Sequence, residues 1–197
     1  MTMNEDLIMA VEFHGHLCPG IAYGVRAAQI AIKELIEKRA EDEEIVAIVE
    51  NDSCAVDAIQ ALTGCTFGKG NLIFKDYGKQ VYTFIKRPSG EAIRIALTWE
   101  PPPETPEEQC LWQRHMKGDI SPEVIKCIQE RKTKKVNLIM EVAESELFTV
   151  DKFTTILPKT ARIFPSIKCA MCGEKVMEPR SRVKNGQIVC LPCFEDE

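Results

Sequence analysis

Two pairs of cysteines near the C-terminal end constrain the fold of this chain more than any other feature. Cys169 and Cys172 form a C-x-x-C pair, and Cys190 and Cys193 form a second pair after an interval of 17 residues. Zinc takes four thiolate ligands in tetrahedral geometry, and this spacing is typical of structural zinc sites. The segment between the pairs is too short to bury a core, so the metal would supply the folding energy. The spacing predicts a module over residues 166–197 in which these four cysteines bind structural zinc.

Cysteine number and charge limit the classes of protein to consider. The 197 residues include nine cysteines, an odd number that cannot pair completely within one chain, and the net charge is -5. No signal peptide is visible, and no run approaches the roughly 18 apolar residues that would span a bilayer. We expect a cytoplasmic protein without a membrane partner, whose thiols serve metal ligation or thiol chemistry. The excess of basic residues between Lys159 and Cys193 is interpreted as solvated surface, so nucleic acid is not the expected partner.

The order of the predicted elements favours an α+β fold. Apolar periodicity, capping residues and prolines predict helices over 4–11, 20–39, 55–62, 106–117 and 122–145. Alternating patterns predict a strand over 45–49, a hairpin over 80–86 and 91–98, and an extended segment over 148–156. We therefore expect helices packed on a mostly antiparallel sheet. The predicted domains are a core over 1–157, a linker over 158–165 and the zinc module over 166–197.

A second group of metal-binding residues lies near the N-terminus. His14, His16 and Cys18 alternate, so an extended segment would direct all three side chains to one face. Imidazole and thiolate are both good ligands for zinc and related metals. Pro19 makes Cys18 a helix N-cap, and Cys54 opens another helix, where the helix dipole lowers a thiol pKa. This pattern predicts a functional site, either a metal centre or a redox thiol pair.

Other cysteines and a glycine-rich loop leave alternatives open. Cys65 is a fourth ligand, a resolving thiol or a packing residue, whereas Cys110 and Cys127 suit packing roles on helices. The loop over 64–71 is rich in glycine but lacks the spacing of a phosphate-binding loop. We interpret it as a turn in preference to an anion site.

Two long motifs resemble the FmdE family, which takes its name from one component of formylmethanofuran dehydrogenase. The first runs from Phe13 to Gly20 and continues at 24–28, and the second comprises Cys54, 57–60 and 63–72. The resemblance covers roughly residues 7–150 and implies an α+β core whose motif residues gather in one cavity. His16, Cys18 and Cys54 match the positions expected to form a metal- or redox-active site, and His14 and Cys65 match further motif positions.

The C-terminal segment resembles the zinc fingers of DksA/TraR proteins, in which a C-x-x-C-G knuckle precedes a second cysteine pair. That resemblance implies a small treble-clef or ribbon-like module. It carries no transcriptional function to this chain, because the preceding residues are unlike the coiled coils of those proteins.

Three functions follow as hypotheses. The favoured one is a metal-binding accessory protein with a His/Cys cavity that holds a second transition metal, zinc being the expected one, and serves a molybdenum or tungsten oxidoreductase. The second is an enzyme acting on a small molecule, with Cys54 or a bound metal as the reactive group and Asp57 or a histidine as proton carrier. The third is a regulatory protein that docks a partner through its zinc finger.

We also predict a homodimer, with exchange of the zinc module between chains as one form of it. The predicted helix over 122–145 offers a row of apolar residues for burial, and prolines stiffen the segments on either side of it. The members of this row are Val124, Ile128, Val136, Ile139, Met140 and Val142.

Overall fold

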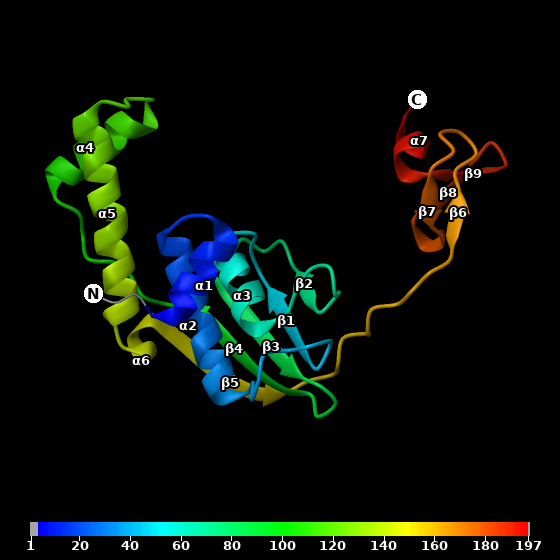
Figure 1. Ribbon diagram of the computed structural model, residues 1–197, viewed down its shortest axis with the longest axis horizontal. Helices are drawn as coiled ribbons and strands as arrows, with labels where there is room; N and C mark the ends of the chain where they lie inside the picture. The colour runs from blue at the N-terminus through cyan, green and yellow to red at the C-terminus, as the bar shows by residue number, and fades with distance from the viewer. Residues whose placement is uncertain (1–3, 197) are drawn as a thin grey trace. The chain divides into compact units, whose positions relative to one another are not determined.

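The computed structural model describes residues 4–196 (Figure 1). The ends of the predicted domains, residues 1–3 and 197, lie outside the described residues. The chain separates into two compact units, Met1–Thr160 and Ala161–Glu197. Within residues 4–196, every helix is too short or too polar to span a bilayer.

A five-stranded sheet forms the base of the first unit. Its strands are ordered β2-β1-β3-β4-β5. Their bounds are Ile45–Val49 for β1, Leu72–Phe74 for β2, Val81–Lys86 for β3, Glu91–Leu97 for β4 and Phe148–Thr154 for β5. Only the β1–β2 pair is parallel, and the other three pairs are antiparallel. The predicted mostly antiparallel sheet and the α+β fold are therefore confirmed.

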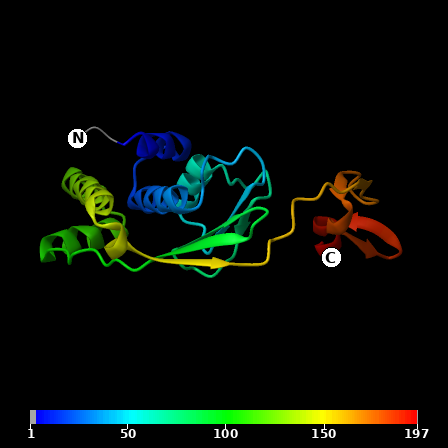
Figure 2. The same cartoon turned by 90° about the horizontal axis from the view of Figure 1, so that it is seen from below.

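Helices cover one face of this sheet (Figure 2). The first three are α1 (Glu5–His14), α2 (Pro19–Glu34) and α3 (Ala55–Thr63). They are followed by α4 (Pro106–Met116), α5 (Pro122–Glu141) and the short α6 (Glu144–Leu147), which leads into β5. The helices α4 and α5 form a pair that extends beyond the sheet (Figure 1).

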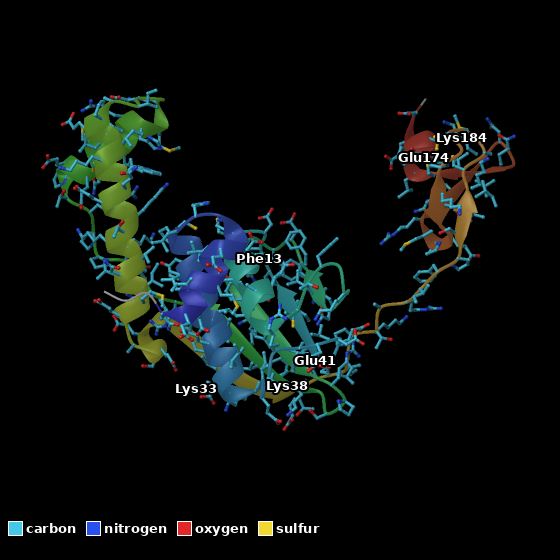
Figure 3. All side chains as sticks on the ribbon, in the orientation of Figure 1. Phe13, Lys33, Lys38, Glu41, Glu174 and Lys184 are labelled. Atoms are coloured by element: carbon cyan, nitrogen blue, oxygen red, sulfur yellow. The ribbon has the colours of Figure 1, made fainter. Side chains whose placement is uncertain are left out.

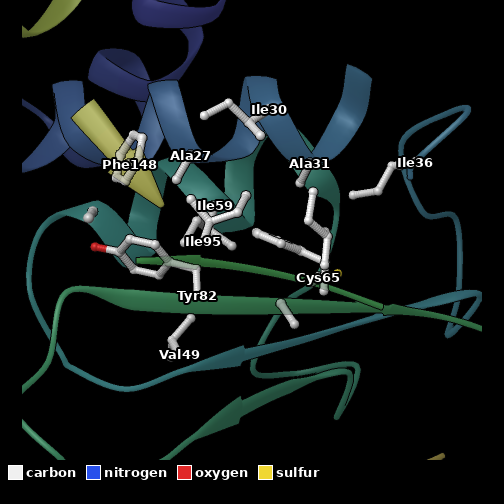
Figure 4. Close-up of a cluster of buried hydrophobic side chains, with 14 of the residues drawn as sticks. Ala27, Ile30, Ala31, Ile36, Val49, Ile59, Cys65, Tyr82, Ile95 and Phe148 are labelled. Carbon is white, nitrogen blue, oxygen red and sulfur yellow. The ribbon is translucent and has the colours of Figure 1, made fainter. Parts of the chain in front are cut away.

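The main core lies between α2, α3 and the sheet (Figure 4). Because side chains alternate along a strand, Tyr82 and Phe84 of β3 both point toward the helices, and both are fully buried. Ile30 of α2 and Ile59 of α3 fill the space above them. The Tyr82 hydroxyl donates a hydrogen bond to Gln80 Oε1 at 2.5 Å, so the buried ring keeps a partner for its polar end.

Two glycines let α2 and α3 approach each other closely. A Cβ at Gly24 would lie 2.3 Å from the Ala55 carbonyl oxygen, and one at Gly20 would lie 2.9 Å from Cys54 Cβ. Real Cβ atoms do not tolerate such distances, so both positions require glycine. The spacing of these glycines along α2 therefore fixes where the start of α3, and with it Cys54, can lie.

The apolar face of α5 packs within its own chain. Val136 and Ile139 belong to the main core, whereas Val124 and Ile128 pack against Leu111 of α4. The buried guanidinium of Arg26 donates hydrogen bonds to the carbonyl oxygens of Ile139 (2.6 Å) and Val142 (2.8 Å) and so ties down the end of α5. The predicted dimer rested on this face being free, and the structure removes that basis.

The second unit is built from two hairpins and a short helix. Its elements are β6 (Ser166–Lys168), β7 (Lys175–Met177), β8 (Ser181–Lys184), β9 (Gln187–Cys190) and α7 (Leu191–Glu195). The β8–β9 turn has Asn185 and Gly186 at φ 53° and 78°, as a tight hairpin requires. A knuckle and hairpin followed by a helix that carries the last ligand is the treble-clef arrangement, one of the two forms expected.

Candidate metal centre

Three helix ends meet at a cluster of metal-binding side chains. His14 is the last residue of α1, Cys18 is the N-cap of α2, and Cys54 is the N-cap of α3. Their ligand atoms all lie within 4.8 Å of one another. Residues far apart in the sequence are thus brought into one site, because the Gly20 and Gly24 contacts hold α3 against α2.

The two ring nitrogens of His14 have different environments. Nδ1 donates a hydrogen bond to Asp57 Oδ2 at 2.7 Å. Nε2 is buried and has no hydrogen-bond partner among residues 4–196. A carboxylate on one nitrogen fixes the tautomer in which the other nitrogen carries a lone pair, as in many metal-bound histidines. His14 Nε2 is therefore prepared to bind a metal.

The two thiols differ in exposure. Cys18 is buried, and its Sγ accepts a hydrogen bond from the Ile21 backbone N–H at 3.4 Å. Cys54 is half-buried. Burial raises the pKa of Cys54, and the neighbouring Cys18 thiol and the Asp57 carboxylate raise it further. The sequence led us to expect a lowered pKa at Cys54, whereas burial and these neighbours raise it. A bound cation would reverse this, because a metal deprotonates the thiols that coordinate it.

The histidine of the cluster is His14, whereas the resemblance pointed to His16. We expected residues 14–18 to be extended, but α1 continues to His14 and ends at Gly15, whose φ is 97°. His14 therefore belongs to the helix and joins the cluster, whereas His16 lies beyond its end and is not among the clustered ligand atoms. His16 is exposed, and its ring lies 4.5 Å from the His14 ring, centroid to centroid.

Cys65 is a core residue and not a fourth ligand. It is fully buried among the side chains of the main core (Figure 4). Its thiol donates to the Ile45 carbonyl oxygen at 3.5 Å, and burial raises its pKa to about 11. Of the three alternatives left open for Cys65, packing is the one that the structure supports.

The glycine-rich loop is held by its own chain. Asn71 is fully buried, accepts from the Thr66 backbone N–H at 2.9 Å and donates to the carbonyl oxygens of Asp42 and Ile45. The Lys69 ammonium donates to the Ala40 carbonyl oxygen at 3.0 Å and so is directed at the protein. These contacts agree with the interpretation of the loop as a turn.

An open cleft of about 390 Å³ adjoins the cluster. It lies between α3 and β2, where the parallel strands β1 and β2 end. Its lining residues are His14, Val49, Asn51, Asp52, Ser53, Cys54, Val56, Asp57, Gln60, Phe67, Leu72 and Phe74. Three further residues that line the cleft, Asp52, Phe67 and Phe74, were not expected from the sequence. Polar and aromatic residues directly after a strand and inside a glycine-rich loop were the signal that could have identified them.

The donor set fits a transition metal. Two thiols and one imidazole suit zinc and related ions, and the buried, unpartnered His14 Nε2 gives such an ion a ready ligand. Three protein ligands beside a cleft are typical of metal sites that keep a position open for another molecule, whereas structural zinc sites have four.

The four C-terminal cysteines form a separate cluster in the second unit. Their sulfur atoms lie within 4.8 Å of one another. The backbone N–H groups of Cys172 and Cys190 lower the pKa of Cys169 to about 6, and the Cys190 N–H lies 3.3 Å from its sulfur. Lys184, labelled in Figure 3, donates to the carbonyl oxygens of Cys193 and Phe194 at the end of α7. The cluster fits a closed, structural zinc site.

Comparisons with known proteins agree with the division of the chain into a first unit and a C-terminal zinc module. Residues 13–149 match the family model described as "FmdE, Molybdenum formylmethanofuran dehydrogenase operon". Residues 162–197 match the prokaryotic DksA/TraR C4-type zinc finger. The chain is 35% identical over 195 residues to a protein of Archaeoglobus fulgidus named "Probable S-adenosyl-L-methionine-binding protein". This alignment covers 95% of the chain but 52% of the relative, so the chain spans about half of that protein's length.

A solved structure shares the fold. It is the crystal structure of a tungsten formylmethanofuran dehydrogenase FmdE-like protein from Syntrophus aciditrophicus. The TM-score is 0.63 at 24% sequence identity, and the match covers 96% of this chain and 90% of the other. The family model spans more than half of the sequence, including the residues that build the His/Cys cluster. The chain therefore belongs to the FmdE family.

Proposed function

We propose that this chain binds a transition metal, zinc in the first instance, at His14, Cys18 and Cys54, and presents it to a small molecule in the adjoining cleft. The unpartnered, buried Nε2 of His14 beside two thiols is the observation that carries this proposal. His14 and Cys54 both line the cleft, so the cluster is accessible from it.

Each residue has a distinct role in this proposal. His14, Cys18 and Cys54 supply the ligands. Asp57 accepts the hydrogen bond from His14 Nδ1 and receives a second one from Gln60 Nε2 at 3.4 Å, so it positions the imidazole. Asp57 is thus assigned as a positioning residue in preference to the catalytic role considered from the sequence. When bound, the metal would act as a Lewis acid toward a donor atom of the ligand.

Metal analysis of the purified full chain tests the proposal. We expect about two metal ions per chain, one in each cluster. Cys54→Ser should leave about one, because it removes a ligand of the first cluster only. Cys110→Ser changes an exposed cysteine outside both clusters and should leave two. One metal ion per wild-type chain, unchanged by Cys54→Ser, would show that the His/Cys cluster is not a metal centre.

Service to a molybdenum or tungsten oxidoreductase is a second candidate function. It is supported by the family description and by the name of the structural neighbour, both of which refer to formylmethanofuran dehydrogenase. Affinity purification of the tagged chain from its own cells, followed by molybdenum and tungsten analysis, tests it. Retention of such an enzyme by the wild-type chain and its loss with Cys18→Ser would support the role. Absence of both metals from the purified material would contradict it.

The name of the Archaeoglobus relative adds a candidate for the small molecule. S-adenosyl-L-methionine carries a carboxylate and an amine, which are donors that an open metal position accepts. Calorimetric titration of the metal-loaded chain tests this compound. We expect binding that weakens with Cys54→Ser and is unchanged with Cys110→Ser, whereas no heat of binding to the loaded wild-type chain would remove this candidate.

A further inference from the structure

The cleft beside the metal centre is mostly apolar, and its aromatic residues lie at the surface. Val49, Val56 and Leu72 line it, together with Phe67 and Phe74. Phe67 is 78% exposed and Phe74 is 46% exposed, although phenylalanine is normally buried. Exposed aromatic faces at a cleft are suited to stacking against a flat ring of a ligand.

Most polar side chains of the cleft are engaged within the protein. Asn51 donates to the Lys79 carbonyl oxygen at 2.6 Å and accepts from the Ser53 N–H and hydroxyl. Gln60 accepts from the Phe67 N–H at 3.2 Å and donates to Asp57. These two amides are therefore poorly placed to form hydrogen bonds with the polar atoms at the edge of a bound ring.

Asp52 is the exception. It is exposed in the loop that leads from β1 to α3, and its carboxylate has no hydrogen bond or ion pair within the part of the chain that the structure describes. A carboxylate at the end of a strand is well placed to accept hydrogen bonds from the two hydroxyls of a ribose. Among the described residues that line the cleft there is no lysine or arginine, so a phosphate would meet acidic groups without compensation.

From this chemistry we propose that the cleft binds a nucleoside, with its base stacked on Phe67, the more exposed of the two rings, and its ribose hydroxyls on Asp52. The inference deepens the proposed function, because it names the class of molecule that the cleft would bring to the metal. The inference also predicts which nucleosides and nucleotides the cleft binds. Stacking accepts any base, and the acidic lining disfavours nucleotides, so adenosine and guanosine should bind alike and adenosine monophosphate should bind more weakly.

Equilibrium dialysis of the metal-loaded full chain against adenosine tests the inference. We expect saturable binding of one adenosine per chain. Asp52→Asn should weaken it ~10-fold, because a hydrogen bond to a charged group is lost. Phe67→Ala should also weaken it ~10-fold, because stacking is lost. Asp151→Asn and Phe153→Ala change residues of β5 outside the cleft and serve as matched controls, with no expected effect.

A ligand that lacks the ribose diol distinguishes loss of the contact with Asp52 from a general disruption of the fold by the substitution. The wild-type chain should bind 2′,3′-dideoxyadenosine about as weakly as Asp52→Asn does, and that variant should bind both ligands alike. Absence of adenosine binding overturns the inference, as does binding that neither cleft variant weakens or that is as tight for adenosine monophosphate. Metal content measured in the same samples distinguishes failure of the nucleoside proposal from failure of the metal-centre proposal. Two metal ions without adenosine binding refute only the nucleoside, and adenosine binding without metal in the His/Cys cluster refutes only the metal centre.

Discussion

His14 shows how one hydrogen bond prepares a ligand. The imidazole could present either nitrogen, but the Asp57 carboxylate accepts the Nδ1–H hydrogen bond at 2.7 Å, which leaves Nε2 without a partner among the described residues and able to bind a metal. Carboxylates in this position set the tautomer and the ring orientation and increase the basicity of the ligand. The metal affinity of the centre should therefore depend on a residue that does not touch the metal.

We predict that Asp57→Asn lowers the affinity of the His/Cys centre for zinc by ~10- to 100-fold. The amide N–H of asparagine can donate a hydrogen bond to Nδ1 and so stabilise the tautomer in which Nε2 carries the proton and cannot bind the metal. Competition with a chromophoric chelator measures the change, and the C-terminal site of the same chain provides an internal control. Asp52→Asn changes a carboxylate of the same cleft that has no contact with His14 and should leave the affinity unchanged. Equal affinities for the two variants would show that Asp57 does not position the ligand.

At the scale of single residues, the sequence predicted that histidine and cysteine form the cluster, but it did not predict correctly which histidine belongs to it. Cys18 and Cys54 were expected in the cluster and are there, because helix starts are marked by proline and by the end of a strand. His16 was favoured over His14 because the family resemblance pointed to it, and the predicted helix ended at residue 11, so the position of His14 at the end of α1 was not foreseen. A helix end that depends on a positive φ at Gly15 is difficult to locate from one sequence. The burial of Cys65 depends on tertiary packing, which spacing does not reveal.

The contact between α2 and α3 determines the geometry of the centre at the level of elements. We predict that Gly24→Ala destabilises the fold by about 1–3 kcal/mol and weakens metal binding, because the new Cβ would meet the Ala55 carbonyl oxygen at 2.3 Å. Chemical denaturation and chelator competition measure the two effects. Gly68→Ala is the matched control, since a Cβ there would meet no atom within 4 Å. A Gly24→Ala chain with wild-type stability and metal affinity would refute the role given to this contact.

The turn between α4 and α5 supplies a prediction for acidic pH. Asp119 accepts from the Ser121 backbone N–H at 2.9 Å and from Arg114 Nε at 2.9 Å. These contacts lower the pKa of Asp119 from 3.8 to about 2, the Ser121 N–H being the largest cause. Because the folded pKa is the lower one, its contribution to stability is present above pH ~4 and is lost as the pH falls toward 2.

NMR titration of the Asp119 carboxyl carbon checks this value. We expect a midpoint well below that of an exposed aspartate, and Arg114→Gln should raise it toward the ordinary range. A midpoint near 4 for Asp119 would contradict the contacts seen in the turn.

The longer helices and strands were predicted, although two helices end earlier than expected, and the shortest strand of the sheet was not predicted. The Thr105–Glu108 capping box is present and starts α4 as expected. The helix predicted over 20–39 ends at Glu34, and the helix predicted over 122–145 ends at Glu141, where its last turn meets Arg26. The strand β2 was missed, because three residues carry little pattern and its parallel pairing with β1 is a long-range contact.

At the scale of the whole molecule, the two clusters of metal-binding side chains lie in separate units, so the C-terminal cluster can be tested by itself. We predict that Cys172→Ser releases about one zinc ion per chain and makes residues 166–196 sensitive to protease, because the small module depends on its metal for folding. Limited proteolysis followed by mass spectrometry measures this. The first unit should remain intact, since it has its own hydrophobic core. A module that resists protease in the variant would mean that its hairpins fold without metal.

The predicted α+β core and zinc module follow from local patterns and are both present. The expected dimer is not shown, since the apolar face behind that prediction packs against α2, α4 and the sheet. Amphipathic periodicity identifies a face that must be buried but does not identify what buries it. The cytoplasmic location and the boundary of the linker at 158–165 stay predictions.

The position of His14 at the end of α1 has a consequence for how the centre is loaded. Two ligands are held by α2 and α3, which pack against each other through glycine, whereas the third belongs to a ten-residue helix at the start of the chain. This helix buries Leu7 and Ala10 and contributes no strand to the sheet. Undocking of α1 would remove the His14 ligand while leaving in place the α2–α3 contact that positions Cys18 and Cys54. The affinity of the centre for a metal would then depend on how firmly this one short helix packs against the rest of the first unit.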